Sequence, residues 1–97
     1  MERLTEEQIA AELAQTEGWV RKDEKWIERK YRFKEFMQGI QFVNQVAELA
    51  EQYNHHPMIA IDYKLVTLRL SSWNAGGLTG LDMKMAREFN EMYGKLG

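Results

Sequence analysis

The first apolar residues of the chain recur at the spacing of a helix. They follow Thr5-Glu6-Glu7-Gln8, which has the form of a capping box, where a hydroxyl and a side chain three residues later each accept a backbone N–H. We therefore predict a helix that begins after Thr5 and ends near Gly18. Its apolar stripe consists of Ile9, Ala10, Leu13 and Ala14.

From Trp19 to Phe33 the pattern changes to an alternation of apolar and charged side chains, which is typical of a strand with one buried face. A polar stretch at residues 22–25 interrupts the pattern and predicts the turn of a β-hairpin. The alternation directs three charged side chains toward water, those of Glu28, Lys30 and Arg32.

Between Lys34 and Tyr53 the helical period returns, and this segment is the longest predicted helix. Pro57 disfavours helical geometry at the residue before it, so the chain is expected to become extended just after His56. The stripe expected to face the core consists of Phe36, Ile40, Val43, Ala47 and Ala50.

Two further elements are predicted in the last third of the chain. Residues 59–71 alternate again around a tight turn near Tyr63-Lys64, which predicts a second hairpin. After a glycine-containing loop at residues 74–77, Thr79 and Asp82 form another capping box and open a final helix. Its apolar stripe consists of Met85, Phe89, Met92 and Leu96.

The element order αββαββα predicts an α+β fold, with residues 1–97 as a single domain. We expect a four-stranded antiparallel sheet with the three helices packed on one face. A chain of 97 residues buries only a modest core, which makes self-association plausible as a further source of buried surface.

Composition and charge narrow the function classes. There is no cysteine, which excludes disulfides, thiolate metal ligands and a cysteine nucleophile. The net charge is -2, from 13 basic and 15 acidic residues, so nothing indicates a nucleic-acid or membrane partner. The N-terminal residues lack the basic and apolar segments of a signal peptide, and no later run is long enough to span a bilayer. We expect a cytoplasmic protein.

The two histidines of the chain are adjacent, at the predicted end of the longest helix. Glu51 lies four residues before His55, so if the helix persists to His55, the carboxylate can reach the imidazole and fix its tautomer. An imidazole supported in this way is suited to general acid-base catalysis near neutral pH.

The spacing of these residues resembles the signature of the pterin-4a-carbinolamine dehydratase family. An acidic or polar residue is followed after three positions by His-His-Pro, then by an aromatic residue, by histidine or tryptophan, and by aspartate at set intervals. The matching residues are Glu51, His55, His56, Pro57, Tyr63, Trp73 and Asp82. The predicted element order also matches the family fold over nearly the whole chain.

The resemblance implies a lyase that dehydrates 4a-hydroxytetrahydropterin to quinonoid dihydropterin, in support of tetrahydrobiopterin recycling. It implies no cofactor, no metal and a homodimer or homotetramer. His55 would be the main acid-base group, with Glu51 to orient it, and His56 would bind pterin or handle a second proton. Asp82 would hold polar pterin atoms or a histidine. The implied substrate-binding residues are His55, His56, Pro57, Ser72, Trp73 and Asp82.

Several alternatives remain open from the residues themselves. Many family members carry a third catalytic histidine where this chain has Trp73, whose indole stacks on flat rings but does not exchange protons near neutral pH. A non-catalytic pterin-fold module that binds a protein partner, or acts in assembly or regulation, is therefore the second hypothesis. The histidines could also serve only as cations at a helix C-terminus, or join Glu51 in binding zinc, and Asp82 could be only a helix cap.

Overall fold

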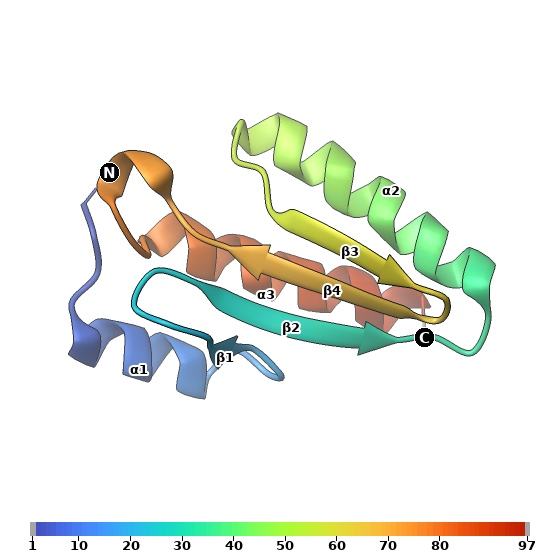
Figure 1. Ribbon diagram of the computed structural model, residues 1–97, viewed down its shortest axis with the longest axis horizontal. Coiled ribbons are helices and arrows are strands. Elements are labelled where there is room, and N and C mark those ends of the chain that lie inside the picture. Colours follow the sequence, from blue (N-terminus) through green and yellow to red (C-terminus); the bar gives the residue numbers. More distant parts are fainter. Residues whose placement is uncertain (1, 97) are drawn as a thin grey trace.

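A computed structural model describes residues 2–96 of the protein, and its helices and strands follow the predicted order (Figure 1). The four strands form one antiparallel sheet in the order β1-β2-β4-β3. The elements are α1 (Glu6–Ala14), β1 (Val20–Arg21), β2 (Ile27–Arg32), α2 (Phe36–Tyr53), β3 (Met58–Asp62), β4 (Leu65–Leu70), the 3-10 turn η1 (Trp73–Ala75) and α3 (Gly80–Leu96). The predicted α+β class is confirmed.

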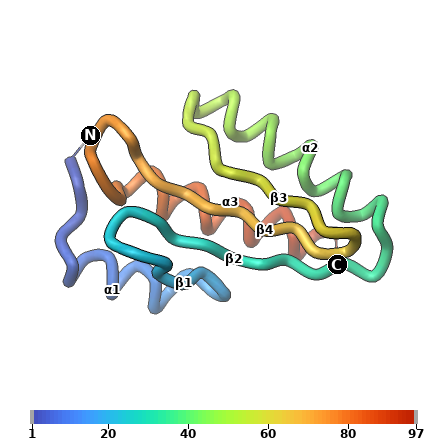
Figure 2. Tube along the Cα trace, viewed as in Figure 1, coloured from blue at the N-terminus to red at the C-terminus, as the bar shows by residue number. Residues whose placement is uncertain are grey.

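The core lies between the sheet and the helices on one of its faces. The apolar side chains of β2 and β4 on this face are fully buried and join one cluster with residues of α2 and α3. The register pairs Ile27 with Leu70 and Tyr31 with Val66, so the alternation predicted from the sequence is correct. Figures 1 and 2 show α3 running behind β4, α2 along β3 and α1 beside β1. The opposite face of the sheet carries Lys30 and Arg32 and stays open.

Helix α2 turns a different face to the core from the one predicted. Phe36 and Ala47 of the predicted stripe are exposed, and only its last member, Ala50, is fully buried. The other buried residues of the helix are Gly39, Phe42 and Val46. The helix carries two adjacent apolar stripes, and its period alone does not show which of them meets the sheet. Phe36 instead stacks on Tyr63, with the ring centres 6.4 Å apart, at the exposed end of the sheet.

Helix α2 ends at Tyr53, two residues before the paired histidines. Asn54 adopts left-handed geometry, with φ of 50°, and its N–H donates to the carbonyls of Ala50 and Glu51. Asparagine tolerates this conformation better than most residues, because its short polar side chain can bond locally. The chain therefore leaves the helix before His55, at Tyr53, where the helical period in the sequence also ends.

The first helix is shorter than predicted but is capped as expected. Thr5 Oγ1 accepts the N–H of Gln8, and the Gln8 side chain accepts the N–H of Thr5. The helix ends at Ala14 rather than near Gly18, and Thr16 donates its hydroxyl to the carbonyl of Glu12 in the following turn.

A polar cluster joins the first hairpin to α3. Asn90 Oδ1 accepts hydrogen bonds from Tyr31 Oη at 2.6 Å, Arg29 Nη1 at 2.7 Å and Trp19 Nε1 at 3.1 Å. Asn90 Nδ2 in turn donates to the carbonyl of Glu17. Burial raises the pKa of the Tyr31 phenol, because the interior disfavours the phenolate. This cluster holds the hairpin and the last helix in one relative position.

Candidate active site

The imidazole of His55 is anchored by a buried carboxylate. His55 Nε2 lies 2.7 Å from Asp82 Oδ1, and Asp82 is fully buried in the first turn of α3. The other oxygen, Oδ2, accepts hydrogen bonds from Ser72 Oγ at 2.7 Å and from the Thr79 N–H at 2.9 Å. The bond from Thr79 is one half of the predicted capping box, so Asp82 both caps the helix and holds the histidine.

This anchoring determines which nitrogen of His55 is available. A carboxylate only accepts hydrogen bonds, so we expect the neutral imidazole to carry its proton on Nε2 and to leave a lone pair on Nδ1. Among the described residues, Nδ1 has no hydrogen-bond partner and is not one of the buried unpaired polar atoms. The His55 side chain is 16% exposed, so Nδ1 is the atom that a ligand would meet.

His56 has its own carboxylate partner, and the pairing differs from the prediction. His56 Nε2 forms a hydrogen bond with Glu51 Oε2, and both side chains are largely exposed. We expected Glu51 to orient His55. That expectation was wrong, because the four-residue spacing brings two side chains together only within a helix, and α2 ends at Tyr53.

A cavity of about 490 Å³ opens in front of both imidazoles and is called the histidine cavity below. Four of the predicted site residues line it, namely His55, His56, Ser72 and Trp73. Its other lining residues, which were not predicted as site residues, are Asn54, Ser71, Asn74, Ala75, Thr79 and Leu81.

Three predicted site residues do not line the histidine cavity. Asp82 lies behind His55 and has no accessible surface, so as a predicted substrate-binding residue it is wrongly placed for direct contact. Glu51 reaches the cavity only through His56, and Pro57 is half-buried outside the lining. The two imidazoles thus line the histidine cavity, and the two carboxylates bonded to them lie outside its lining.

Trp73 forms an exposed aromatic wall of the histidine cavity. Trp73 is 84% exposed at the start of η1, and its ring meets that of Trp26 edge to face, with centres 6.4 Å apart. Gly76 closes the turn in left-handed geometry, with φ of 73°. An exposed indole beside two imidazoles is suited to stacking on a flat heterocycle.

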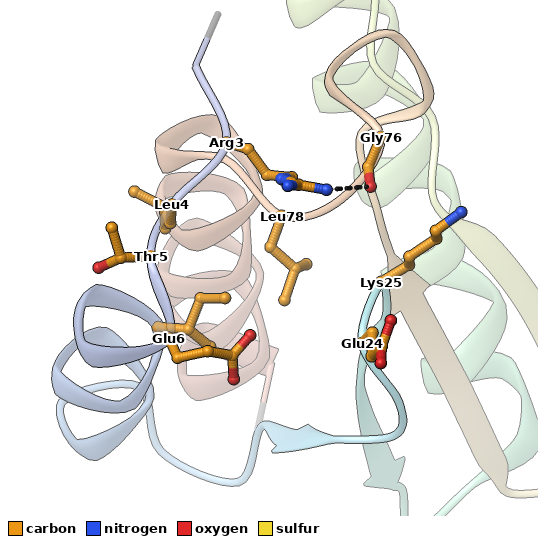
Figure 3. A pocket seen from close by; sticks show the side chains of 9 residues that line it. Arg3, Leu4, Thr5, Glu6, Glu24, Lys25, Gly76 and Leu78 are labelled. Atoms are coloured by element: carbon orange, nitrogen blue, oxygen red, sulfur yellow. Dashed lines mark hydrogen bonds between the residues drawn. The ribbon is translucent and has the colours of Figure 1, made fainter.

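A second cavity of similar size, about 490 Å³, lies at the start of α1 and has different chemistry (Figure 3). Its charged lining residues are Arg3, Glu6, Glu24 and Lys25, and Arg3 Nη1 donates to the carbonyl of Gly76. It contains no imidazole, so the histidine cavity is the better candidate for acid-base work near neutral pH.

The described residues contain neither a metal-binding cluster nor a membrane-spanning helix. Residues 2–96 contain no group of three or more His, Asp or Glu side chains arranged to hold a metal ion. Within the same residues, no helix has the length and apolar composition that crossing a membrane would require.

The fold and the site define a small α+β protein with paired imidazole–carboxylate groups at one cavity. The family model described as pterin 4 alpha carbinolamine dehydratase matches residues 2–92, and the chain belongs to this family. A relative from Koribacter versatilis (strain Ellin345), named "Putative pterin-4-alpha-carbinolamine dehydratase", is 46% identical and is aligned over 93% of this chain and 95% of its own length. A relative of the same name from Picosynechococcus is 43% identical over 93% of this chain and 97% of its own.

Two solved structures share the fold. The transcriptional coactivator/pterin dehydratase from Brucella melitensis superimposes with a TM-score of 0.90 and 35% identity, covering 94% of this chain and 98% of its own. A pterin dehydratase-like protein described as a RuBisCO assembly factor in the alpha-carboxysome has a TM-score of 0.68 and 19% identity, covering 79% of this chain and 90% of its own. The second similarity concerns the fold alone.

Proposed function

We propose that the protein is a cytoplasmic 4a-hydroxytetrahydropterin dehydratase that supports tetrahydropterin recycling. The observation that carries this proposal is the pair of adjacent imidazoles, each bound through Nε2 to a carboxylate, at one cavity with an aromatic wall. Membership of the pterin-4a-carbinolamine dehydratase family supports the choice of substrate.

The reaction needs one proton given and one proton taken. The hydroxyl on the 4a carbon must be protonated to leave as water, while the adjacent ring nitrogen loses its proton and forms the new C=N bond. Hydroxide is a poor leaving group, and a positioned acid or base typically contributes ~10²–10⁴-fold to such a step. Two imidazoles can supply both functions without a metal or a cofactor.

The two histidines differ in their surroundings, which suggests different roles. Asp82 is buried and held by Ser72 and Thr79, so His55 has a fixed orientation and its imidazolium form would be stabilised as it appears. We assign the principal acid-base step to His55 Nδ1. His56 is 55% exposed and is suited to binding the pterin edge and exchanging its proton with water.

The direct test uses chemically generated 4a-hydroxytetrahydropterin and follows its decay in ultraviolet absorbance near neutral pH. We expect the protein to accelerate the decay, and we expect His55→Ala to lower the rate constant at least ~10²-fold. If the wild type gave no acceleration, the dehydratase assignment would be wrong. A fully active His55→Ala would instead reject the role given to His55. A wild type that is inactive, but is folded and still binds a protein partner, would favour the non-catalytic module.

We also propose that the protein is a homo-oligomer assembled through β3. All residues of this edge strand are exposed, and Met58, Ile59 and Ile61 are large apolar side chains. An exposed apolar edge strand is a template for pairing, and a second copy of β3 can pair with it antiparallel about a twofold axis. Ile61→Lys should convert the assembly to monomers in analytical ultracentrifugation, and a wild type that sediments as a monomer would contradict the proposal.

A further inference from the structure

Arg69 presents a guanidinium group with unused hydrogen-bond donors on the open face of the sheet. It lies in the row of paired residues Glu28, Arg69 and Met58 across β2, β4 and β3. Its Cζ atom is 5.2 Å from the ring centre of Trp26, so the guanidinium rests on the indole. Nε is buried without a hydrogen-bond partner, and no hydrogen bond from the other two nitrogens occurs within residues 2–96.

Glu28, the carboxylate nearest to Arg69, leaves the hydrogen-bond donors of the guanidinium free. Glu28 Oε1 lies 3.7 Å from Arg69 Nε, which is longer than a hydrogen bond, and Glu28 Oε2 lies 3.6 Å from Lys22 Nζ. The group of Lys22, Glu28 and Arg69 therefore keeps a charge of about +1 in a chain whose net charge is -2. A guanidinium with free hydrogen-bond donors, in a cluster of net positive charge, is suited to binding a carboxylate or phosphate.

This cationic group is continuous with the histidine cavity. Trp26 contacts both Arg69 and Trp73, and Trp73 lines the cavity. Ser71, another lining residue, lies two positions after Arg69 in extended chain, which corresponds to about 7 Å. A bicyclic ring placed against Trp73 could therefore extend a substituent along Trp26 as far as Arg69.

We infer that Trp26 and Arg69 form a second subsite that binds an anionic substituent of the pterin, a carboxylate or a phosphate. The inference rests on the dehydratase function proposed above and specifies its substrate class. Trp26 supports the guanidinium and the chain of the substituent, and Arg69 binds the terminal anion. The ring chemistry stays with His55, so this subsite acts on substrate affinity and not on the proton transfers.

The experiment compares substrates that differ only in the substituent. Tetrahydropterins with a neutral polyol chain, with its phosphate monoester and with a chain ending in glutamate are each oxidised to the 4a-hydroxy form and offered to the enzyme. Arg69→Gln should raise KM for at least one anionic substrate by about tenfold, the equivalent of one charge-assisted hydrogen bond, with kcat unchanged. KM for the neutral substrate should change less than about twofold.

Lys30→Gln is the matched control, because Lys30 is exposed on the same face of the sheet but contacts neither tryptophan. It removes the same charge and should leave all three KM values within about twofold. If Arg69→Gln and Lys30→Gln raised KM for the anionic substrates equally, general electrostatic attraction would explain the effect and the subsite would be rejected. Equal effects of Arg69→Gln on neutral and anionic substrates would also reject it.

A binding measurement separates this inference from the proposed activity. Calorimetric titration with the corresponding stable 7,8-dihydropterins needs no turnover, and the anionic compounds should bind more tightly in an Arg69-dependent manner. An inactive wild type that shows this preference would reject the dehydratase function and keep the anion subsite. An active enzyme without the preference would reject the subsite alone. Comparing the phosphate with the glutamate compound identifies which anion is preferred.

Discussion

The buried Asp82 carboxylate lies 2.7 Å from His55 Nε2, although the two residues are 27 positions apart in the chain. The contact joins the end of α2 to the first turn of α3 and fixes the orientation of the imidazole. Ser72 and Thr79 also donate to Asp82, so its buried oxygens have hydrogen-bond partners that compensate for the hydration lost on burial.

Removing the charge of Asp82 should impair catalysis far more than substrate binding. Asp82→Asn keeps the size of the side chain but offers His55 a weaker acceptor and permits the other tautomer, so we expect kcat to fall at least ~10²-fold. Steady-state kinetics with Glu91→Gln, an exposed carboxylate on the same helix, provides the control. A kcat within about threefold of the wild type would contradict the supporting role.

Glu51→Gln should have a smaller effect than Asp82→Asn. The pair of Glu51 and His56 is exposed to water, and exposed ion pairs contribute only ~0–1 kcal/mol, so the rate should fall less than about tenfold. Glu48→Gln, on the same helix and exposed, is the matched control. If Glu51→Gln were as damaging as Asp82→Asn, the assignment of His55 as the principal group would have to be exchanged with His56.

Trp73 should contribute to pterin affinity through stacking. Trp73→Ala removes the aromatic wall and should raise KM by about tenfold, given ~0.5–1.5 kcal/mol for an aromatic pair beyond its buried area. Trp73→Phe retains a ring and should recover most of that loss, with kcat little changed in both variants. A fall in kcat with an unaltered KM would show that Trp73 serves the chemical step instead.

Asn90 should be important for stability and not for the site. Asn90→Ala leaves the donors of Trp19, Arg29 and Tyr31 without their shared acceptor, and we expect the free energy of unfolding to fall by ~2–4 kcal/mol. Urea denaturation followed by circular dichroism measures this. Asn44→Ala, on the exposed side of α2, should change stability by less than ~0.5 kcal/mol, and an equal loss there would remove the basis of the prediction.

Stability should decline at alkaline pH because of Tyr31. Burial raises its folded-state pKa above the unfolded value of about 10, so its contribution is complete below pH ~10 and is lost as pH rises toward the folded pKa. The free energy of unfolding should fall by up to ~1.4 kcal/mol per pH unit in that range. Tyr31→Phe should lack this part of the slope, and identical slopes for the two proteins would disprove the assignment to Tyr31.

Much of the fold could be predicted from the sequence because its signals are local. The alternation around Ile27 and Tyr31, the capping box at Thr5 and the turn at Tyr63 each depend on residues a few positions apart. The face that α2 buries could not be predicted, because Phe36 and Phe42 lie on different stripes of similar apolarity. Only the three-dimensional position of the sheet decides between them.

The site was predictable as a group of residues but not as a set of contacts. Adjacent histidines and the later Trp73 and Asp82 indicated one site, and the structure brings them together at or behind one cavity. The partner of each imidazole depends on Asn54, whose left-handed geometry ends the helix at Tyr53. A single residue thus decides which histidine Glu51 reaches, and no periodic pattern contains that information.

In the proposed mechanism, His55 carries its proton on Nε2 and offers Nδ1 to the pterin. Nitrogen-15 NMR of histidine-labelled protein measures this directly, and His56→Gln assigns the two imidazoles. We predict that neutral His55 is the Nε2–H tautomer, and that adding a 7,8-dihydropterin shifts its Nδ1 resonance. A neutral His55 protonated on Nδ1, or a spectrum unaltered by saturating dihydropterin, would contradict the account.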